Sequence, residues 1–281
     1  MNGPRSSASA RWLTAEELPA TFGDLPRRPA GLWCMGDPSA MEAAPGRHVA
    51  IVGTREASPY GIRIAERLAT VAVRAGLVVV SGLARGIDAA AHRAALQAGG
   101  RTIGVQGTGV DVPYPASHRT LHAALVARGT VLSEMEPGTG ATPGCFPRRN
   151  RLIAALCQVT VVVEAPFKSG AINTATQALE LGRTVAAVPG RVDETTAQGS
   201  NQLIRDGAQV IAEVADLLAL FSIGPGRSEK GVMEHWERAV PVHRPEQSVT
   251  WGASAPLPGT DNVSDVRGYS ESLLRNELGR W

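Results

Sequence analysis

The sequence predicts an α/β fold: a doubly wound and mostly parallel sheet with helices on both faces. Three observations support this prediction. Strand-like and helix-like windows alternate regularly from residue 48 to about residue 221, as they do in α/β domains. Several strand windows are unbroken aliphatic runs, such as LVVV at 77–80, which are typical of strands buried on both faces. Glycine turns follow two of these strands, at the sheet edge where ligands bind in such folds.

The expected elements divide the chain into three parts. Residues 1–46 form a short, partly ordered lead-in, where prolines exclude long helices and we expect a capped helical turn at 14–18 and a short strand within 29–37. Residues 47–221 form the α/β domain. Its expected strands are 48–53, 77–81, 101–106, 130–133, 159–164, 184–188 and 208–211. Its expected helices are 59–75, 86–98, 116–128, 148–156, 171–182, 200–206 and 213–221.

The third part, residues 222–281, is predicted to be a disordered C-terminal tail. Periodicity stops at this point, and Pro, Gly, Ser and charged residues dominate up to about residue 265. A short amphipathic helix is conceivable at 269–278, but an isolated helix of that length is marginal in water. We therefore expect a frayed terminus there rather than a partner-binding helix.

Composition limits the function classes. The net formal charge is +2 and aromatic residues make up 4% of the chain, so any nucleic-acid binding must use a local basic patch. The cysteines Cys34, Cys145 and Cys157 form neither a disulfide framework nor a CxxC metal pair, which fits a reducing compartment. The sequence holds no apolar signal segment and no run long enough to span a bilayer. We expect a soluble, cytoplasmic protein with no membrane contact, metal or other cofactor.

Two glycine turns predict an anion site. One follows the strand at 48–53 and the other follows the strand at 77–81, and each contains arginine. Backbone N–H groups at a helix start, together with a guanidinium, can bind a phosphate, although each turn could also be an ordinary strand–helix connection. Neither turn matches the dinucleotide fingerprint or the P-loop, which argues against an NAD enzyme and a P-loop NTPase. The candidate binding residues are Gly53, Thr54, Arg55, Ser81, Gly82, Arg85 and Gly86.

Asp88 and His92, just after the second turn, allow two interpretations. They lie four residues apart, on one face of the expected helix. They could be an acid–base pair in a catalytic pocket or a helix-stabilising pair that faces the loop. We favour the second interpretation, because neither a nucleophile nor a set of metal ligands accompanies them.

Two further junctions extend the candidate site. Residues 146–153, FPRRNRLI, place arginines in the first turn of an expected helix, where the helix dipole disfavours cations, so we expect a bound anion there rather than a salt-bridge network. The loop after the strand at 159–164 offers a cation, a hydroxyl and backbone N–H groups, and its serine can also cap the next helix. These junctions add the candidates Arg148, Arg149, Asn150, Lys168, Ser169 and Gly170.

These junctions, in this order, resemble the DprA/Smf family of DNA-processing proteins. The resemblance covers about residues 25–220. It rests on VAIVGTR, PYG, SGLARGIDAAAH, GTGVDVPYP, LSEMEPGT, FPRRNRLIA, VVEAPFKSGAINTA and GRTVAAVPG followed by GSNQLIRDGA. So many ordered matches are far more specific than any single motif.

The resemblance implies an extended Rossmann-like, doubly wound domain at residues 47–221 and a non-enzymatic protein that binds single-stranded DNA. It further implies that the protein protects incoming DNA during natural transformation, loads the recombinase RecA onto it, and forms a homodimer. The candidate residues of the four junctions carry over as DNA contacts, mostly to phosphates, which fix position without reading sequence. The low aromatic content argues against an extended stacking platform, although a narrow pocket could take an unstacked base.

The chain also departs from the family pattern. We expect neither the complete helical N-terminal domain nor the C-terminal winged helix that many members have. Ala171 and Asn173 differ from an SGSLIT-like segment, which removes one hydroxyl donor from the third loop. Two other function classes stay open: a nucleotide enzyme related to the Rossmann-like phosphoribohydrolases, whose PGGxGTxxE signature is matched only poorly at Val188-Pro189-Gly190, and a nucleotide-sensing module.

Overall fold

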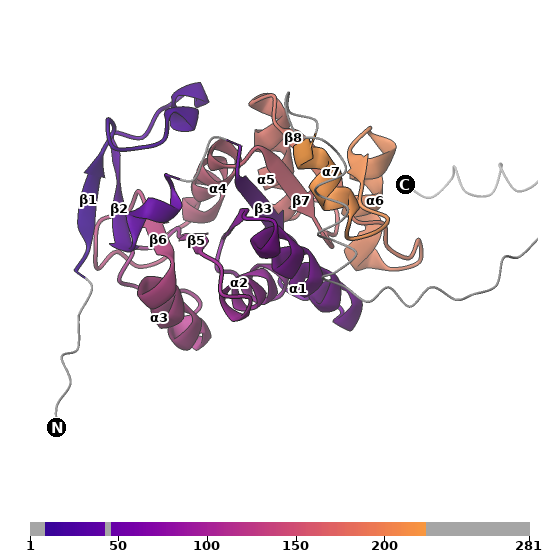
Figure 1. The fold of residues 1–281 in the computed structure, drawn as a ribbon, viewed down its shortest axis with the longest axis horizontal. Coiled ribbons are helices and arrows are strands. Elements are labelled where there is room, and N and C mark those ends of the chain that lie inside the picture. The colour runs from indigo at the N-terminus through magenta and orange to yellow at the C-terminus, as the bar shows by residue number, and fades with distance from the viewer. Residues whose placement is uncertain (1–8, 43–45, 223–281) are drawn as a thin grey trace, which may run out of the picture. The chain divides into compact units, whose positions relative to one another are not determined.

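The computed structural model describes residues 9–42 and 46–222, which contain a nine-stranded sheet (Figure 1). The strand order is β1-β2-β6-β5-β4-β3-β7-β8-β9. All neighbouring strands from β6 to the β9 end of this order pair in parallel. Strand β2 is antiparallel to both β1 and β6. The predicted mostly parallel α/β sheet is therefore confirmed. The strands are β1 (Arg11–Thr14), β2 (Gly31–Gly36), β3 (His48–Val52), β4 (Val78–Ser81), β5 (Thr102–Val105), β6 (Thr130–Ser133), β7 (Val159–Val162), β8 (Thr184–Ala187) and β9 (Gln209–Val210).

Helices cover both faces of this sheet. In Figure 1, α1 and α2 lie on one side of the central strands, and α4 and α5 lie on the other. Side chains of α1, α2 and α7 share one buried apolar cluster, and those of α4 and α5 share a second. The helices are α1 (Pro59–Arg74), α2 (Ile87–Gln97), α3 (Arg119–Arg128), α4 (Cys145–Leu156), α5 (Gly170–Glu180), α6 (Gln198–Arg205) and α7 (Asp216–Ser222), with short 3-10 turns at Ala20–Asp24, Pro38–Ala40, Ala116–His118 and Thr195–Ala197.

Strand β3 shows why the aliphatic runs are continuous. Val49 and Ile51 belong to the cluster on the α1 and α2 side, whereas Ala50 and Val52 belong to the cluster on the α4 and α5 side. Because successive side chains of a strand point to opposite faces, a strand covered on both faces needs apolar residues at every position. The apolar run therefore places β3 in the middle of the sheet.

The lead-in contributes to the same sheet. The strand expected within 29–37 is confirmed as β2, whereas β1 was not expected. The turn expected at 14–18 is present: the Glu17 amide donates to the Thr14 carbonyl at 3.1 Å, and the Glu17 carboxylate accepts from the Thr14 amide at 2.9 Å. Leu13, Phe22 and Leu25 are buried in the cluster that also holds α4 and α5. The tail predicted from residue 222 and the helix considered at 269–278 lie outside the described residues, apart from Ser222 at the end of α7.

The direction in which strands are added reverses at β3. From β3 the chain adds β4 and β5 on one side, and later adds β7, β8 and β9 on the other side. In open parallel sheets such a reversal leaves a crevice outside the carboxyl ends of the strands. The loops after β3, β4 and β7 meet at this crevice, which positions the candidate site.

Candidate nucleic-acid interface

Two adjoining cavities, of about 230 and about 660 Å³, lie at the carboxyl ends of the strands. Both are lined by Arg55, Ala84, Arg85, Phe146 and Arg149. The larger cavity adds candidate residues from three junctions: Gly53, Thr54, Asn150, Ser169 and Gly170. The smaller adds Gly82, while Arg148 lines a separate small cavity beside Arg149. The structure thus brings together the loops that sequence reasoning proposed.

The turn after β3 is held by a buried glutamate, Glu164, which lies two residues beyond the end of β7. The Thr54 amide donates to the Glu164 carbonyl at 2.7 Å, and the Glu164 carboxylate accepts from both the amide and the hydroxyl of Ser58. Gly61 packs so closely that a Cβ atom there would lie 2.3 Å from Glu164 Oε2. These contacts fix the loop and leave Arg55 exposed, with its guanidinium 5.3 Å above the centre of the Phe146 ring.

The turn after β4 offers fewer free amides than the sequence suggested. Asp88 Oδ2 accepts from the amides of Gly82 and Ala84, at 3.1 and 3.4 Å, and the Ser81 hydroxyl donates to the Ile51 carbonyl at 2.7 Å. Ser81 is completely buried. The expectation that this turn presents its backbone to a ligand is corrected: two of its amides already bind a carboxylate of the protein itself.

The glycines of this turn serve internal packing. A Cβ on Gly82 would lie 2.4 Å from Nη1 of Arg149, and a Cβ on Gly86 would lie 2.3 Å from the Thr54 carbonyl oxygen. Gly86 also has a φ of 74°, in the region that glycine favours. Gly86 therefore brings the second loop against the first, Gly82 brings it against α4, and Arg85 stays exposed.

Asp88 and His92 do not act as a pair. Nδ1 of His92 lies 2.8 Å from the Thr102 hydroxyl, whereas Asp88 binds the loop amides. Burial lowers the pKa of His92 to about 3, so its ring is neutral at physiological pH. Burial also raises the pKa of Asp88, opposed mainly by the positive charge of Arg149. Asp88 faces the loop as predicted, but the helix-stabilising partnership with His92 is wrong.

The arginines of α4 point to different partners. The helix begins at Cys145, so Pro147 is its third residue and the arginines follow the first turn. Arg148 is exposed, whereas Arg149 is buried and its Nη1 donates to the carbonyls of Gly82, at 2.6 Å, and Val105. Burial lowers the pKa of Arg149 to about 10, which leaves the guanidinium charged at neutral pH. Arg149 therefore joins the ends of β4 and β5 from below the surface.

Asn150 continues this connection to the third junction. Its side-chain oxygen accepts from Nε of Arg149 at 3.1 Å, and its side-chain nitrogen donates to the Gly170 carbonyl and to Asn173 Oδ1. Ser169 caps α5 by accepting from the Ile172 amide at 3.3 Å, as the sequence predicted. Lys168 precedes this cap, is exposed, and has a φ of 55°.

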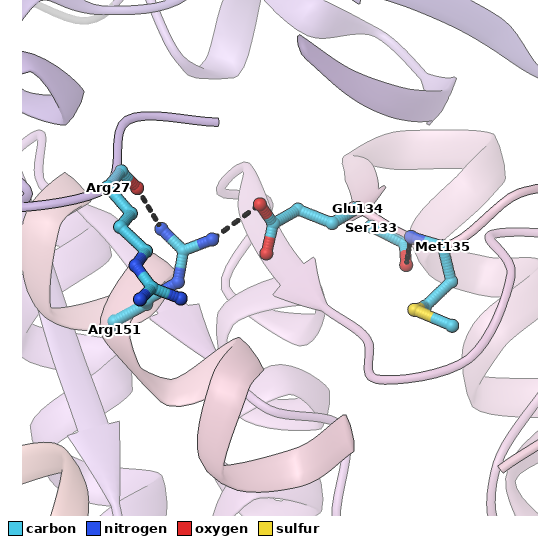
Figure 2. Close-up of polar contacts among 5 residues, drawn as sticks. All are labelled: Arg27, Ser133, Glu134, Met135 and Arg151. Carbon is cyan, nitrogen blue, oxygen red and sulfur yellow. Dashed lines mark hydrogen bonds and ion pairs between the residues drawn. The ribbon is translucent and has the colours of Figure 1, made fainter. Parts of the chain in front are cut away.

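Arg151 anchors the lead-in rather than the cavity. Figure 2 shows its guanidinium between the carbonyl oxygen of Arg27, at 2.8 Å, and the carboxylate of Glu134, just beyond β6. Met135 follows, and its amide donates to the Ser133 hydroxyl at 2.9 Å. A single guanidinium therefore ties α4, the end of β6 and the lead-in together.

Sequence reasoning missed two aromatic residues and a glutamine at the smaller cavity. The rings of Tyr114 and Phe146 lie 5.1 Å apart, and Tyr114 is partly exposed. Gln106 is buried, and its Nε2 donates to the Gly109 carbonyl at 2.9 Å, which fixes the loop that leads to Tyr114. PYP at 113–115 and FP at 146–147 are far apart in sequence, so no local pattern indicated that their rings meet.

The charge of this edge is carried by four exposed cations. Arg55, Arg85, Arg148 and Lys168 are exposed, and none of them forms an ion pair with another of the described residues. Across residues 9–42 and 46–222, His, Cys, Asp and Glu nowhere gather in threes that could hold a metal ion. No helix within those ranges is long and apolar enough to cross a bilayer. The edge is therefore suited to an extended anion bound by side-chain cations.

Comparison with known proteins adds a family match. A family model described as DNA recombination-mediator protein A matches residues 10–222. A DNA-processing protein of Mycobacterium tuberculosis is 44% identical over 190 residues, which are 68% of this chain and 49% of that protein. Protein Smf of Synechocystis is 41% identical over 273 residues, 94% of this chain and 68% of that one. The chain thus spans about half the length of the mycobacterial relative it matches.

Two solved structures share the fold. The DNA processing protein A of Streptococcus pneumoniae has a TM-score of 0.71 and 37% identity, over 75% of this chain and 74% of that one. The protein of the same name from Helicobacter pylori has a TM-score of 0.70 and 31% identity, over 77% of this chain and 98% of that one. The latter structure describes how that protein binds single-stranded DNA.

Proposed function

Because the chain belongs to the DNA recombination-mediator protein A family, we propose that it binds single-stranded DNA across the carboxyl ends of β3, β4 and β7. The observation that carries the proposal is the set of four exposed cations on the loops at this edge, of which Arg55 and Arg85 line both adjoining cavities. Unpaired cations at the carboxyl edge can bind successive phosphates of one strand, a contact that does not depend on base sequence. The Helicobacter pylori relative, which binds single-stranded DNA, supports the same ligand class here.

The aromatic pair favours a single strand over a duplex. Tyr114 and Phe146 line the smaller cavity, and Arg55 lies over the Phe146 ring. Bases of a single strand expose their faces and can stack on an aromatic ring, whereas the bases of a duplex are already stacked. We propose that one base enters this cavity while its neighbouring phosphates meet Arg55 and Arg85.

The remaining parts of the proposed function rest on the family. We propose that the chain protects single-stranded DNA during natural transformation, presents it to RecA as a homodimer, and works in the cytoplasm without catalysing a reaction. The surroundings of Asp88 and His92 support the last point, since Asp88 binds two loop amides and the His92 ring is fully buried, away from any ligand. Turnover of nucleoside monophosphates to free base would instead favour the phosphoribohydrolase alternative.

A salt series tests the DNA site. Binding of fluorescent oligo-dT, measured by anisotropy, should exceed binding of duplex DNA and weaken linearly on a log–log plot against salt. Arg55→Ala and Arg148→Ala should each lower the slope by about 0.7, the value for one lost single-strand phosphate contact. Arg128→Ala is the matched control, because Arg128 is exposed at the end of α3, on the opposite edge of the sheet. Unchanged slopes for both site variants would contradict the proposed site.

A further inference from the structure

We infer that Asp88 is a positioning residue for anion binding, which fills the backbone amides of the second glycine turn so that phosphates there must bind side-chain cations. This inference rests on the proposed function and assigns one residue that shapes the proposed DNA site. Asp88 Oδ2 accepts from the amides of Gly82 and Ala84, and Asp88 is itself 5% exposed. A carboxylate of the protein thus occupies the position at which a glycine turn otherwise binds a phosphate oxygen.

The turn needs such an anchor because its backbone is strained. Leu83, between the two bonded amides, has a φ of 58°, which is uncommon for a residue with a branched side chain. Its carbonyl oxygen lies 2.9 Å from Nδ1 of His118, and the Gly82 carbonyl accepts from Arg149. Asp88 supplies the contacts on the amide side, so the turn is held from both its carbonyls and its amides. Arg85, which follows the turn, is thereby presented to the cavities.

The sign of the effect separates positioning from simple repulsion. A buried negative charge close to a phosphate site weakens anion binding, so its removal alone should tighten binding. Loss of the Asp88 hydrogen bonds should instead weaken DNA binding, because part of the binding free energy must then order the turn and Arg85. Asp88→Asn keeps an oxygen acceptor for the two amides, whereas Asp88→Ala removes it and leaves a space the size of a small carboxylate.

The test uses the full chain and oligo-dT. Asp88→Ala should weaken binding about tenfold, the order expected from loss of a pair of buried hydrogen bonds, with an unchanged salt slope because no cation is lost. Asp88→Asn should bind within about threefold of the parent, since its hydrogen bonds remain. Formate at about 0.1 M, against chloride at equal ionic strength, should restore most of the affinity of Asp88→Ala by refilling the site. Hydrogen exchange of the Gly82 and Ala84 amides should rise in that variant and fall again with formate.

A matched control removes the same chemistry elsewhere. Asp216 Oδ2 also accepts from two backbone amides, those of Ala212 and Glu213 at 2.8 and 2.9 Å, but none of these residues lines the cavities. Asp216→Ala should leave oligo-dT binding unchanged. Tighter binding by both Asp88 variants, or failure of formate to restore Asp88→Ala while that variant remains folded by circular dichroism, would overturn the inference. If the parent chain itself does not bind oligo-dT, the proposed function fails instead.

Discussion

Acidification should destabilise this protein through a buried histidine. His92 is fully buried, and burial lowers its pKa from 6.5 to about 3. The unfolded chain binds a proton near pH 6.5, whereas the folded chain does not until near pH 3, so the unfolded state gains protons first as pH falls. Stability contributed by the neutral ring is therefore present above about pH 6.5 and is lost progressively below it.

The size of this loss follows from the two pKa values. Between pH 7 and pH 5, proton uptake by the unfolded state should lower the free energy of unfolding by about 2 kcal/mol for His92 alone. For a domain of this length that corresponds to a fall in Tm of about 4 to 8 °C. Burial also lowers the pKa of His48 and of His122, so these residues change stability in the same direction.

A variant isolates the contribution of His92. His92→Asn keeps a side-chain nitrogen to donate to the Thr102 hydroxyl but does not titrate in this range. Urea unfolding of parent and variant, followed by circular dichroism at pH 7 and pH 5, gives the free energy difference at each pH. The variant should be less stable at pH 7, and its loss on acidification should be smaller by about 2 kcal/mol. Equal losses in parent and variant would refute the assignment of a neutral, buried His92.

Two further substitutions test the packing beneath the site. Gly82→Ala places a methyl group against the buried guanidinium of Arg149 and should lower the free energy of unfolding in urea by about 2 kcal/mol. The control Gly140→Ala, where a Cβ meets nothing within 4 Å, should leave it unchanged. Equal urea midpoints for the two variants would contradict the close packing at Gly82. Arg151→Ala removes the contacts to the Arg27 carbonyl and to Glu134, so trypsin should cleave after Arg27 faster than in the parent. The free energy of unfolding should fall by only about 1 kcal/mol. An unchanged cleavage rate would show that other contacts hold the lead-in.

Sequence reasoning found the parallel strands because their aliphatic runs report burial on both faces. It missed β1, since RWLT buries only Leu13 and a four-residue edge strand has too few positions to show a pattern. It placed the start of α4 a few residues late, because Gly144 in a left-handed conformation, rather than a capping side chain, begins the helix.

The candidate site was predicted by location more fully than by residue role. The loops after β3, β4 and β7 meet as expected, since parallel strands end at the same edge. The sequence could not distinguish exposed Arg148 from buried Arg149, because adjacent helix residues differ by about 100° in direction and only the packed sheet decides which one points inward. The pairing of Tyr114 with Phe146 depends on contact between distant loops, which no local pattern records. The DNA contacts themselves stay a prediction.

The antiparallel pair at one end of the sheet has a consequence for aggregation. The six mutually parallel strands from β6 to β8 would leave two edges with unpaired backbone groups if the sheet stopped there. Instead β2 covers β6, and the sheet ends at β1, four residues that include exposed Arg11, while the other end is the two-residue β9. Short, charged edges offer few unpaired backbone groups to another chain. The lead-in thus protects a strongly apolar sheet from joining its copies edge to edge.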